Sequence, residues 1–244
     1  MWVTGRHPVE ELLRSPRQKP SRVLLAAGGP ESERKEILAL AARAGVPVTT
    51  CPKEEWQRRT GDREGGGIAA ELQEFRPAEF REWLASLPQH ADAYLLDGVT
   101  DPQNLGAILR NARAFGIAGV VVPRDRSCPV TAAVFRSSAG AAAHVPVVPV
   151  TNLARAIGEM KESGFWVYAA TRDGEADLSG FSPPARTALV LGSEGTGIRR
   201  LVREGCDGTI RIGIEPGVDS LNVAAASGIL GWALRTARRR AESR

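Results

Sequence analysis

Two side chains that could handle an anionic substrate, Asn104 and Arg110, follow the apolar segment Tyr94 to Leu96. Asp101 and Pro102 predict the start of a helix, because aspartate accepts a hydrogen bond from a free first-turn N–H and proline fits the first helical position. Asn104 then falls in the first turn, near the end of the predicted strand, whereas Arg110 lies almost opposite the apolar stripe. From spacing alone, a solvated surface residue is the simpler interpretation of Arg110.

A glycine-rich loop follows the apolar strand Leu189 to Leu191 and begins at Gly192 with the sequence Gly-Ser-Glu-Gly-Thr-Gly. Glycines at such a junction let backbone groups approach a ligand closely. The loop lacks the lysine of a phosphate-binding loop, and it has Glu194 where the dinucleotide fingerprint has glycine. Because an acidic side chain repels phosphates, nucleoside di- and triphosphates are poor candidates. A ligand with ribose hydroxyls and a cationic centre fits better.

A third polar segment follows the apolar strand predicted over Thr209 to Ile214. A Pro-Gly turn at Pro216 leads to Ser220, which is predicted to cap a helix of small residues. Ser220 and Asn222 could bind a substrate or could serve only as capping groups. This segment alone leaves both interpretations open.

The elements that must position these segments alternate between strand and helix, which predicts an α/β fold with a mostly parallel sheet and ligands beyond the carboxyl ends of its strands. An N-terminal α/β unit over residues 1–75 and a linker with a packing helix over residues 76–92 precede the domain of residues 93–244. In the N-terminal unit, strands are expected at Arg22 to Ala26, Val46 to Thr50 and Ile68 to Leu72, and helices after His7, at Glu31 to Ala44 and at Pro52 to Arg59. In the domain that follows, strands are expected at Tyr94 to Leu96, Val120 to Val122, Val145 to Val150, Phe165 to Ala170, Ala188 to Leu191 and Thr209 to Ile214.

Composition narrows the class of protein without identifying it. The net charge of +4 favours an anionic partner. A C-terminal run of arginines is expected to be either a solvated helix end or an RNA contact. No apolar run approaches the roughly 20 residues needed to span a membrane, and the N-terminus lacks a secretory signal, so we expect no membrane association and a cytoplasmic location. The three cysteines indicate neither disulfides nor zinc. The arginines of the C-terminal run are Arg235, Arg238, Arg239 and Arg240.

Taken together, the three segments are specific. NxxxxxR from Asn104, LGSEGTG around Gly192, and IxIG with SLNVAAA around Ser220 occur in the order and at the spacing that resemble the SpoU class of RNA ribose methyltransferases, within the SPOUT superfamily. The opening Gly5 to Leu13 and the small unit after it also look like the bacterial subgroup that methylates guanosine in 23S rRNA. One departure, Gly65-Gly66-Gly67 in place of a frequent His-Gln-Gly, bears on the choice of RNA target.

This resemblance implies a fold and a cofactor. The fold is a small, ribosomal-protein-like RNA-binding domain followed by a methyltransferase domain with a deep C-terminal trefoil knot. The knot would form the pocket for S-adenosylmethionine (S-adenosyl-L-methionine), and the matching positions for donor contacts are Gly192, Ile212 and Leu221. Family members form homodimers through the knot, so we expect a homodimer in which a catalytic residue can come from the neighbouring subunit.

The resemblance also implies roles in catalysis. Arg110, placed by an RNA phosphate, would activate the ribose 2′ hydroxyl, while Asn104, Glu194, Ser220 and Asn222 would orient the arginine, the RNA and the loops. Because a free guanidinium is almost never deprotonated near pH 7, stabilisation of developing negative charge is the alternative role for Arg110. The reaction needs no metal, because the leaving group is a sulfonium.

Three alternatives remain at this point. The same chemistry could act on a tRNA guanosine or another rRNA ribose. A non-catalytic RNA-binding or ribosome-assembly factor could retain the fold, although a retired site usually loses some of the residues that are intact here. A nucleotide-dependent oxidoreductase is disfavoured by the glycine loop.

Overall fold

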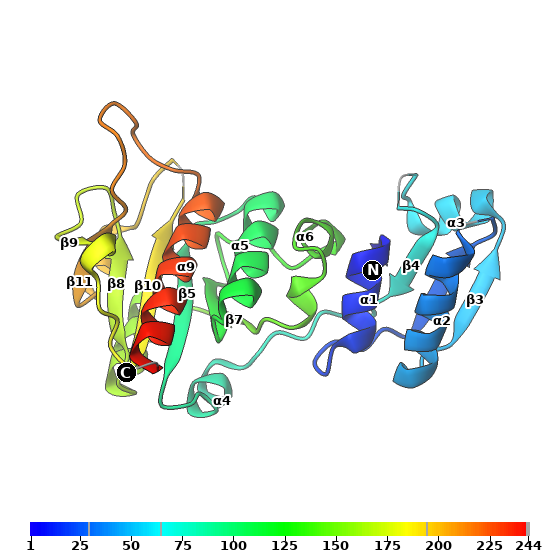
Figure 1. Cartoon of the computed structure of the whole chain (residues 1–244), viewed down its shortest axis with the longest axis horizontal. Coiled ribbons are helices and arrows are strands. Elements are labelled where there is room, and N and C mark those ends of the chain that lie inside the picture. Colours follow the sequence, from blue (N-terminus) through cyan, green and yellow to red (C-terminus); the bar gives the residue numbers. More distant parts are fainter. Residues whose placement is uncertain (29, 64, 194, 243–244) are drawn as a thin grey trace. The chain divides into compact units, whose positions relative to one another are not determined.

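The computed structural model describes residues 1–28, 30–63, 65–193 and 195–242, so Glu194 of the predicted site lies outside the described residues. The chain forms two compact units (Figure 1). Unit 1 comprises Met1–Arg76 and Pro129–His144, and unit 2 comprises Pro77–Cys128 and Val145–Arg244.

Unit 1 is a small α/β unit. Its four-stranded sheet has the order β1-β4-β2-β3, in which β2 and β3 are parallel and β4 runs antiparallel to β1 and β2. The buried Trp56 anchors the core and donates its indole N–H to the Leu24 carbonyl at 3.2 Å. Strand β1 was not predicted. The elements are β1 (Trp2–Thr4), α1 (Arg6–Arg14), β2 (Arg22–Ala26), α2 (Glu31–Ala44), β3 (Val48–Cys51), α3 (Lys53–Thr60), β4 (Ile68–Glu71), α6 (Ala132–Ser137) and the 3-10 helix η1 (Ala141–Ala143).

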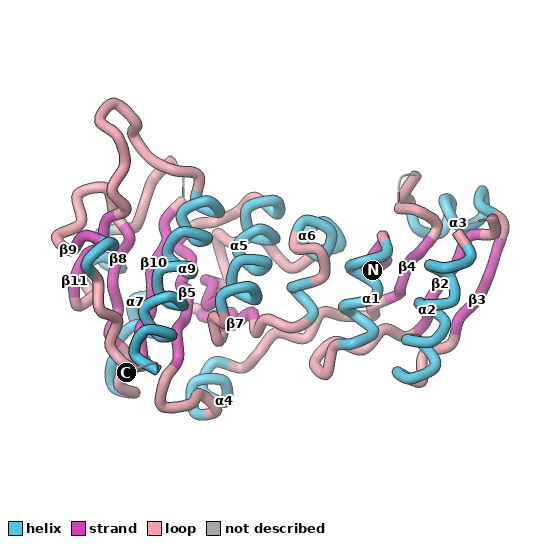
Figure 2. The backbone as a smooth tube through the Cα atoms, in the orientation of Figure 1, coloured by secondary structure: helices cyan, strands magenta, loops and turns pink. Residues whose placement is uncertain are grey.

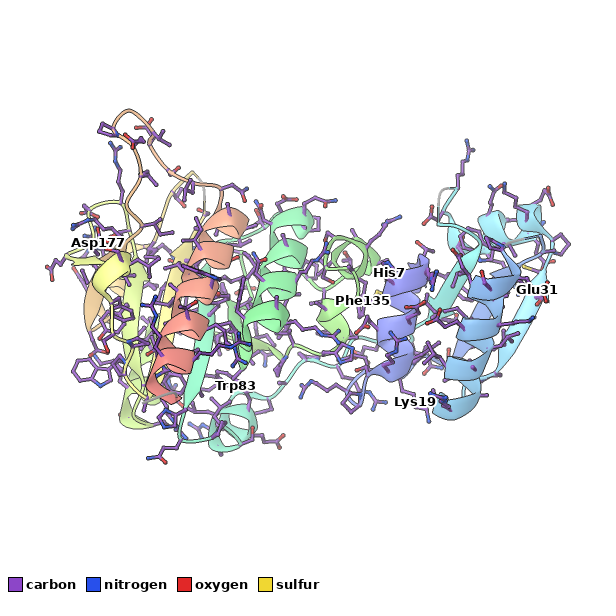
Figure 3. The ribbon with its side chains drawn as sticks, in the orientation of Figure 1. His7, Lys19, Glu31, Trp83, Phe135 and Asp177 are labelled. Carbon is purple, nitrogen blue, oxygen red and sulfur yellow. The ribbon has the colours of Figure 1, made fainter. Side chains whose placement is uncertain are left out.

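A segment from the middle of the chain completes unit 1. Pro129–His144, which carries α6 and η1, packs against β1 and α1. Phe135, labelled in Figure 3, meets the Phe75 ring edge-on with 6.2 Å between centroids. Arg136 pairs with Asp62 at 3.0 Å. The N-terminal unit therefore depends on a segment from the middle of the chain.

Unit 2 contains the predicted parallel sheet. Its seven strands have the order β7-β6-β5-β10-β8-β11-β9, and every neighbouring pair is parallel. The expected strands are present within a few residues, whereas the short edge strand β9 was not predicted. The strands are β5 (Ala91–Asp97), β6 (Gly119–Pro123), β7 (Val147–Val150), β8 (Trp166–Ala170), β9 (Ala176–Asp177), β10 (Arg186–Gly192) and β11 (Gly208–Arg211).

Helices cover both faces of this sheet (Figure 2). Strand residues alternate between the faces, so Tyr94 points to α9, where its hydroxyl donates to the Ser227 carbonyl at 2.7 Å, and Leu95 joins the apolar cluster under α4, α7 and α8. Helix α5 packs beside α9. The helices are α4 (Phe80–Ala85), α5 (Pro102–Phe115), α7 (Leu153–Glu162), the 3-10 helix η2 (Leu178–Gly180), α8 (Arg200–Glu204) and α9 (Val223–Glu242).

The helix ends near the site were predicted with mixed success. Asp101 caps α5 as expected, accepting from the Gln103 and Asn104 N–H groups at 3.1 and 3.3 Å. Of the two capping groups considered for the last helix, Ser220 is wrong and Asn222 is confirmed. Asn222 is the cap, because its Oδ1 accepts from the N–H groups of the first turn of α9 at 2.9 and 3.2 Å. Strand β11 ends at Arg211, which leaves Ile212 in the following loop.

One arginine of the C-terminal run has a structural role that neither interpretation anticipated. Arg238 pairs with Asp92 at 2.7 Å, and its guanidinium also donates to the Pro183 and Pro184 carbonyls. It therefore ties α9 to the amino end of β5. No helix in the described ranges is both long and apolar enough to cross a membrane.

Candidate functional site

Two cavities that share a wall lie beyond the carboxyl ends of β8, β10 and β11. The larger, of about 370 Å³, is lined by Gly192 at the end of β10 and by Ser220 and Leu221 before α9. The smaller, of about 120 Å³, is lined by Ile212 and again by Ser220 and Leu221. All three positions matched to a cofactor therefore meet at one place, and the larger cavity has a size that holds small molecules.

Gly192 is needed for the shape of this wall. A Cβ on Gly192 would lie 2.3 Å from the Gly197 carbonyl carbon and 2.6 Å from the Ile198 nitrogen. The loop folds back this closely because the Gly197 N–H donates to the Ser193 carbonyl at 3.0 Å. No other residue type leaves the two backbone segments in contact, so the glycine serves close approach, as the sequence predicted.

A buried ion pair holds the same loop to the sheet. The Asp97 carboxylate ends β5 with 2% of the residue exposed, and it accepts from the Arg199 backbone N–H at 2.8 Å and from its guanidinium at 2.6 and 2.7 Å. The Asp97 carbonyl also accepts from the Ser193 N–H at 3.1 Å. Sequence reasoning did not single out Asp97. The available signal was an acidic residue at the end of an apolar strand.

Removing the charge of Asp97 is expected to loosen the loop. Because Arg199 is half-exposed, Asp97→Asn should lower the free energy of unfolding by about 1–3 kcal/mol, less than for a fully buried pair. Calorimetry should show a melting temperature several degrees lower, at roughly 2–4 °C per kcal/mol for a chain of this size. Asp219→Asn is the control, because that carboxylate is 96% exposed. Equal melting temperatures for the two variants would contradict this role.

Helices α5 and α9 join the first and third segments. The Asn222 side-chain amide donates to the Asn104 Oδ1 at 2.9 Å. Further along the same two helices, the Asn111 amide donates to the Ala224 carbonyl and the Ser227 hydroxyl, both at 2.9 Å. Two predicted site residues are therefore in direct contact beside the cavity wall.

Arg110 stands apart from this cluster. It is exposed on α5, and it is not among the described residues that line either cavity. No ion pair within the described ranges engages its guanidinium. The structure thus brings together Asn104, Gly192, Ile212, Ser220, Leu221 and Asn222, and it leaves Arg110 available on the surface of the same chain.

The charged residues at the cavity rim are paired. Arg203 donates to Asp173 at 2.9 Å, which is the main reason that the pKa of Asp173 lies below its usual value. Arg172 pairs with Asp219 at 3.0 Å. Neither arginine therefore offers an unpaired charge to a phosphate. Across the described part of the chain, no three His, Cys, Asp or Glu side chains gather as a metal site would require.

Comparison with known proteins decides the family. A family model described as the SpoU rRNA Methylase family matches residues 93–232, and one described as RNA 2′-O ribose methyltransferase substrate binding matches residues 2–78. The chain belongs to the SpoU rRNA methylase family. The mostly parallel sheet and the preceding substrate-binding unit, both predicted, agree with this assignment.

Individual SpoU relatives cover nearly the whole chain. The 23S rRNA (guanosine-2′-O-)-methyltransferase RlmB of Xanthomonas campestris pv. campestris is 38% identical over 236 residues, which cover 93% of each chain. A Porphyromonas gingivalis structure of the TrmH family is 29% identical, with a TM-score of 0.74 and coverage of 98% of this chain and 89% of that one.

A more distant neighbour supports the fold alone. The SpoU methyltransferase AviRb from Streptomyces viridochromogenes, solved in complex with the cofactor AdoMet, is 20% identical with a TM-score of 0.80. The match covers 100% of this chain and 91% of that one.

Proposed function

We propose that this protein transfers a methyl group from S-adenosylmethionine to the ribose 2′ oxygen of a guanosine in 23S rRNA, and that it acts in the cytoplasm. The observation that carries the proposal is the pair of cavities at the carboxyl strand ends, built from the glycine loop and from the segments around Ile212 and Leu221. They occur in a chain 38% identical to an RlmB methyltransferase. RNA methylation is the activity that this family membership supports.

The residues around the cavities fit this cofactor. Backbone groups and small or apolar side chains dominate the wall, and the rim arginines are paired, which suits a nucleoside with a cationic centre better than a polyphosphate. Gly192, Ile212 and Leu221 would hold the nucleoside, largely through backbone groups. When bound there, the cofactor supplies an electrophilic methyl group.

The protein must make the ribose oxygen reactive towards this methyl group. A neutral ribose hydroxyl is a weak nucleophile, so its proton must pass to solvent water or to an RNA phosphate as the methyl group is transferred, and the sulfur would leave as a neutral thioether. Arg110 would bind the adjoining phosphate and stabilise the negative charge that develops on the oxygen. Asn104 and Asn222, already hydrogen-bonded to each other, would orient the RNA together with Ser220 and Glu194.

A homodimer would reconcile the position of Arg110 with this role, and we include it in the proposal. Because Arg110 lines neither cavity of its own chain, it would act at the cavity of the neighbouring subunit. Helix α9 presents Ile229 and Trp232, 38% and 60% exposed, one turn apart on a helix that packs on the sheet elsewhere. Large exposed apolar side chains of this kind are typical of an interface.

Placing a charge on this helix face is expected to weaken the dimer. Trp232→Glu should raise the dimer dissociation constant at least about tenfold, since the carboxylate would lose its water at the interface. Analytical ultracentrifugation measures the change. Trp166→Glu is the matched control, because Trp166 is another half-exposed tryptophan, at the start of β8. A dimer that Trp232→Glu leaves as stable as the control would remove α9 from the interface.

The activity itself is tested by transfer of tritiated methyl groups to 23S rRNA and tRNA transcripts. We expect incorporation into 23S rRNA, as 2′-O-methylguanosine after nuclease digestion. Incorporation into tRNA alone would replace the proposed substrate, and incorporation into neither RNA would favour a non-catalytic RNA-binding factor. The trefoil knot and the boundaries at residues 75 and 93 remain predictions.

A further inference from the structure

A separate cavity of about 530 Å³ lies beyond the carboxyl ends of β6 and β7. Its walls come from the loop after β6, from the amino end of α7, and from residues 199–202 at the start of α8. It shares no lining residue with the cofactor cavities, but consecutive residues of the segment 196–202 line the two. Thr196, Gly197 and Ile198 line the cofactor side, and Arg199 to Val202 line this second cavity.

The second cavity is rich in arginine. Among the described residues, Arg126, Arg199 and Arg200 line it against a single carboxylate, Asp125. A neighbouring cavity of about 340 Å³ shares Thr151 and Asn152 with it, and its charged lining residues are Arg81, Arg124 and Arg155 against Glu79 and Glu159. The local field therefore favours an anion.

The arginines differ in how far they are already neutralised. Arg199 is held by Asp97, and Arg200 pairs with Glu204 at 2.7 Å. By contrast, no ion pair in the described part of the chain engages Arg124 or Arg126, and both are exposed. These two guanidinium groups are the ones that can exchange water for a phosphate, which the planar arginine fork binds through two hydrogen bonds.

The loop that carries them is held to β7 and to the end of β6 by hydrogen bonds. Its first N–H, of Arg124, donates to the Val150 carbonyl at 2.8 Å, and the Ser127 hydroxyl donates to the Pro123 carbonyl. Arg126 has a φ of 61°, a left-handed conformation that non-glycine residues rarely adopt. Residues in such a conformation concentrate at functional sites. The amino end of α7, at Leu153 and Ala154, adds the positive end of a helix dipole to the same cavity.

We propose that this arginine cavity binds phosphates of the RNA strand next to the methylated nucleotide. The inference rests on the proposed function and deepens it. A strand whose ribose reaches the cofactor cavity must continue past it, and segment 196–202 has the cofactor on one side and the arginines on the other. The cavity thus supplies a phosphate contact that fixes the register of the strand, separate from the site of methyl transfer.

The test is the salt dependence of RNA binding. The full-length double variant Arg124→Ala/Arg126→Ala should bind a 23S rRNA transcript roughly tenfold more weakly, and the slope of log Kd against log salt should fall by about 0.7 for each phosphate that the variant no longer neutralises. S-adenosylmethionine binding, measured by calorimetry, should not change. Arg124→Lys/Arg126→Lys keeps the charge and should keep most of the slope.

Controls separate this proposal from the proposed function. Lys161→Ala removes a charge that Asp207 already neutralises at 2.8 Å, at the end of α7 opposite the cavity, and should leave the slope close to that of the wild type. If the Arg124/Arg126 variant has the slope of this control while the wild type methylates RNA, the arginine cavity is wrong and the methyltransferase proposal stands. If the wild type binds the transcript through these arginines but transfers no methyl group, the methyltransferase proposal is wrong and the phosphate-binding proposal is supported. A wild type that does not bind the transcript overturns the cavity proposal.

Discussion

Arg110→Ala is expected to lower the rate of methyl transfer to RNA about 10²- to 10³-fold, the loss typical of removing one group that stabilises charge in a transition state. S-adenosylmethionine affinity should stay at the wild-type value, because Arg110 lines neither cofactor cavity. Single-turnover transfer of labelled methyl groups measures the first quantity, and calorimetry measures the second.

The matched control for Arg110 is on the same helix. Arg113→Ala removes another exposed arginine of α5 and should keep a rate within a few-fold of the wild type. Arg110→Lys distinguishes stabilisation of negative charge from two-pronged binding of the phosphate. A lysine retains the positive charge but not the planar guanidinium that the second role needs. Partial activity in that variant would favour charge stabilisation. A rate for Arg110→Ala equal to that of Arg113→Ala would remove Arg110 from the mechanism.

Gly192→Ala is expected to lower S-adenosylmethionine affinity by at least about 10- to 100-fold, equivalent to roughly 1.4–2.8 kcal/mol. The added methyl group would lie 2.3 Å from the Gly197 carbonyl carbon, so the loop must move away from the end of β10. Gly195→Ala is the control in the same loop, because a Cβ there meets nothing within 4 Å and Gly195 has no left-handed φ. Equal affinities in these two variants would show that the close approach does not shape the pocket.

Mixing the Arg110→Ala and Gly192→Ala variants tests whether each active site is formed by residues of both subunits. If Arg110 acts on the neighbouring subunit, a heterodimer of Arg110→Ala and Gly192→Ala chains holds one intact pocket facing one intact arginine. Random exchange of subunits should then restore about a quarter of the wild-type rate, because half of the dimers carry one working site. No recovery after verified subunit exchange would place Arg110 and the cavity in the same chain.

Local patterns in the sequence predicted much of the fold. The α5 helix begins where Asp101 and Pro102 indicate, because capping acts within a few residues. The alternation of strands with helices predicted the parallel sheet, because neighbouring parallel strands are usually connected through a helix. The short strands β1 and β9 were missed, since two or three residues carry too little periodicity.

The parts of the site that depend on tertiary contacts were less accessible. The pairs Asp97 with Arg199 and Asn104 with Asn222 join residues about a hundred positions apart, and no local pattern connects them. Ser220 was predicted to cap α9 because serine is a common cap, but the extended loop continues two residues further and Asn222 takes that position. The arginine cavity could not be predicted from local sequence patterns, because its walls come from three separate segments.

Because Pro129–His144 belongs to unit 1, this unit cannot be completed early in synthesis on the ribosome. The N-terminal sheet emerges first, but the α6 helix that packs on β1 follows only after residue 137 has been made. At roughly 5–20 residues per second, the nascent unit spends several seconds with that surface uncovered. Unit 1 is therefore completed only after Pro77–Cys128 of unit 2 has been synthesised, and a fragment ending at Arg76 is expected to be a poor substitute for the complete unit 1.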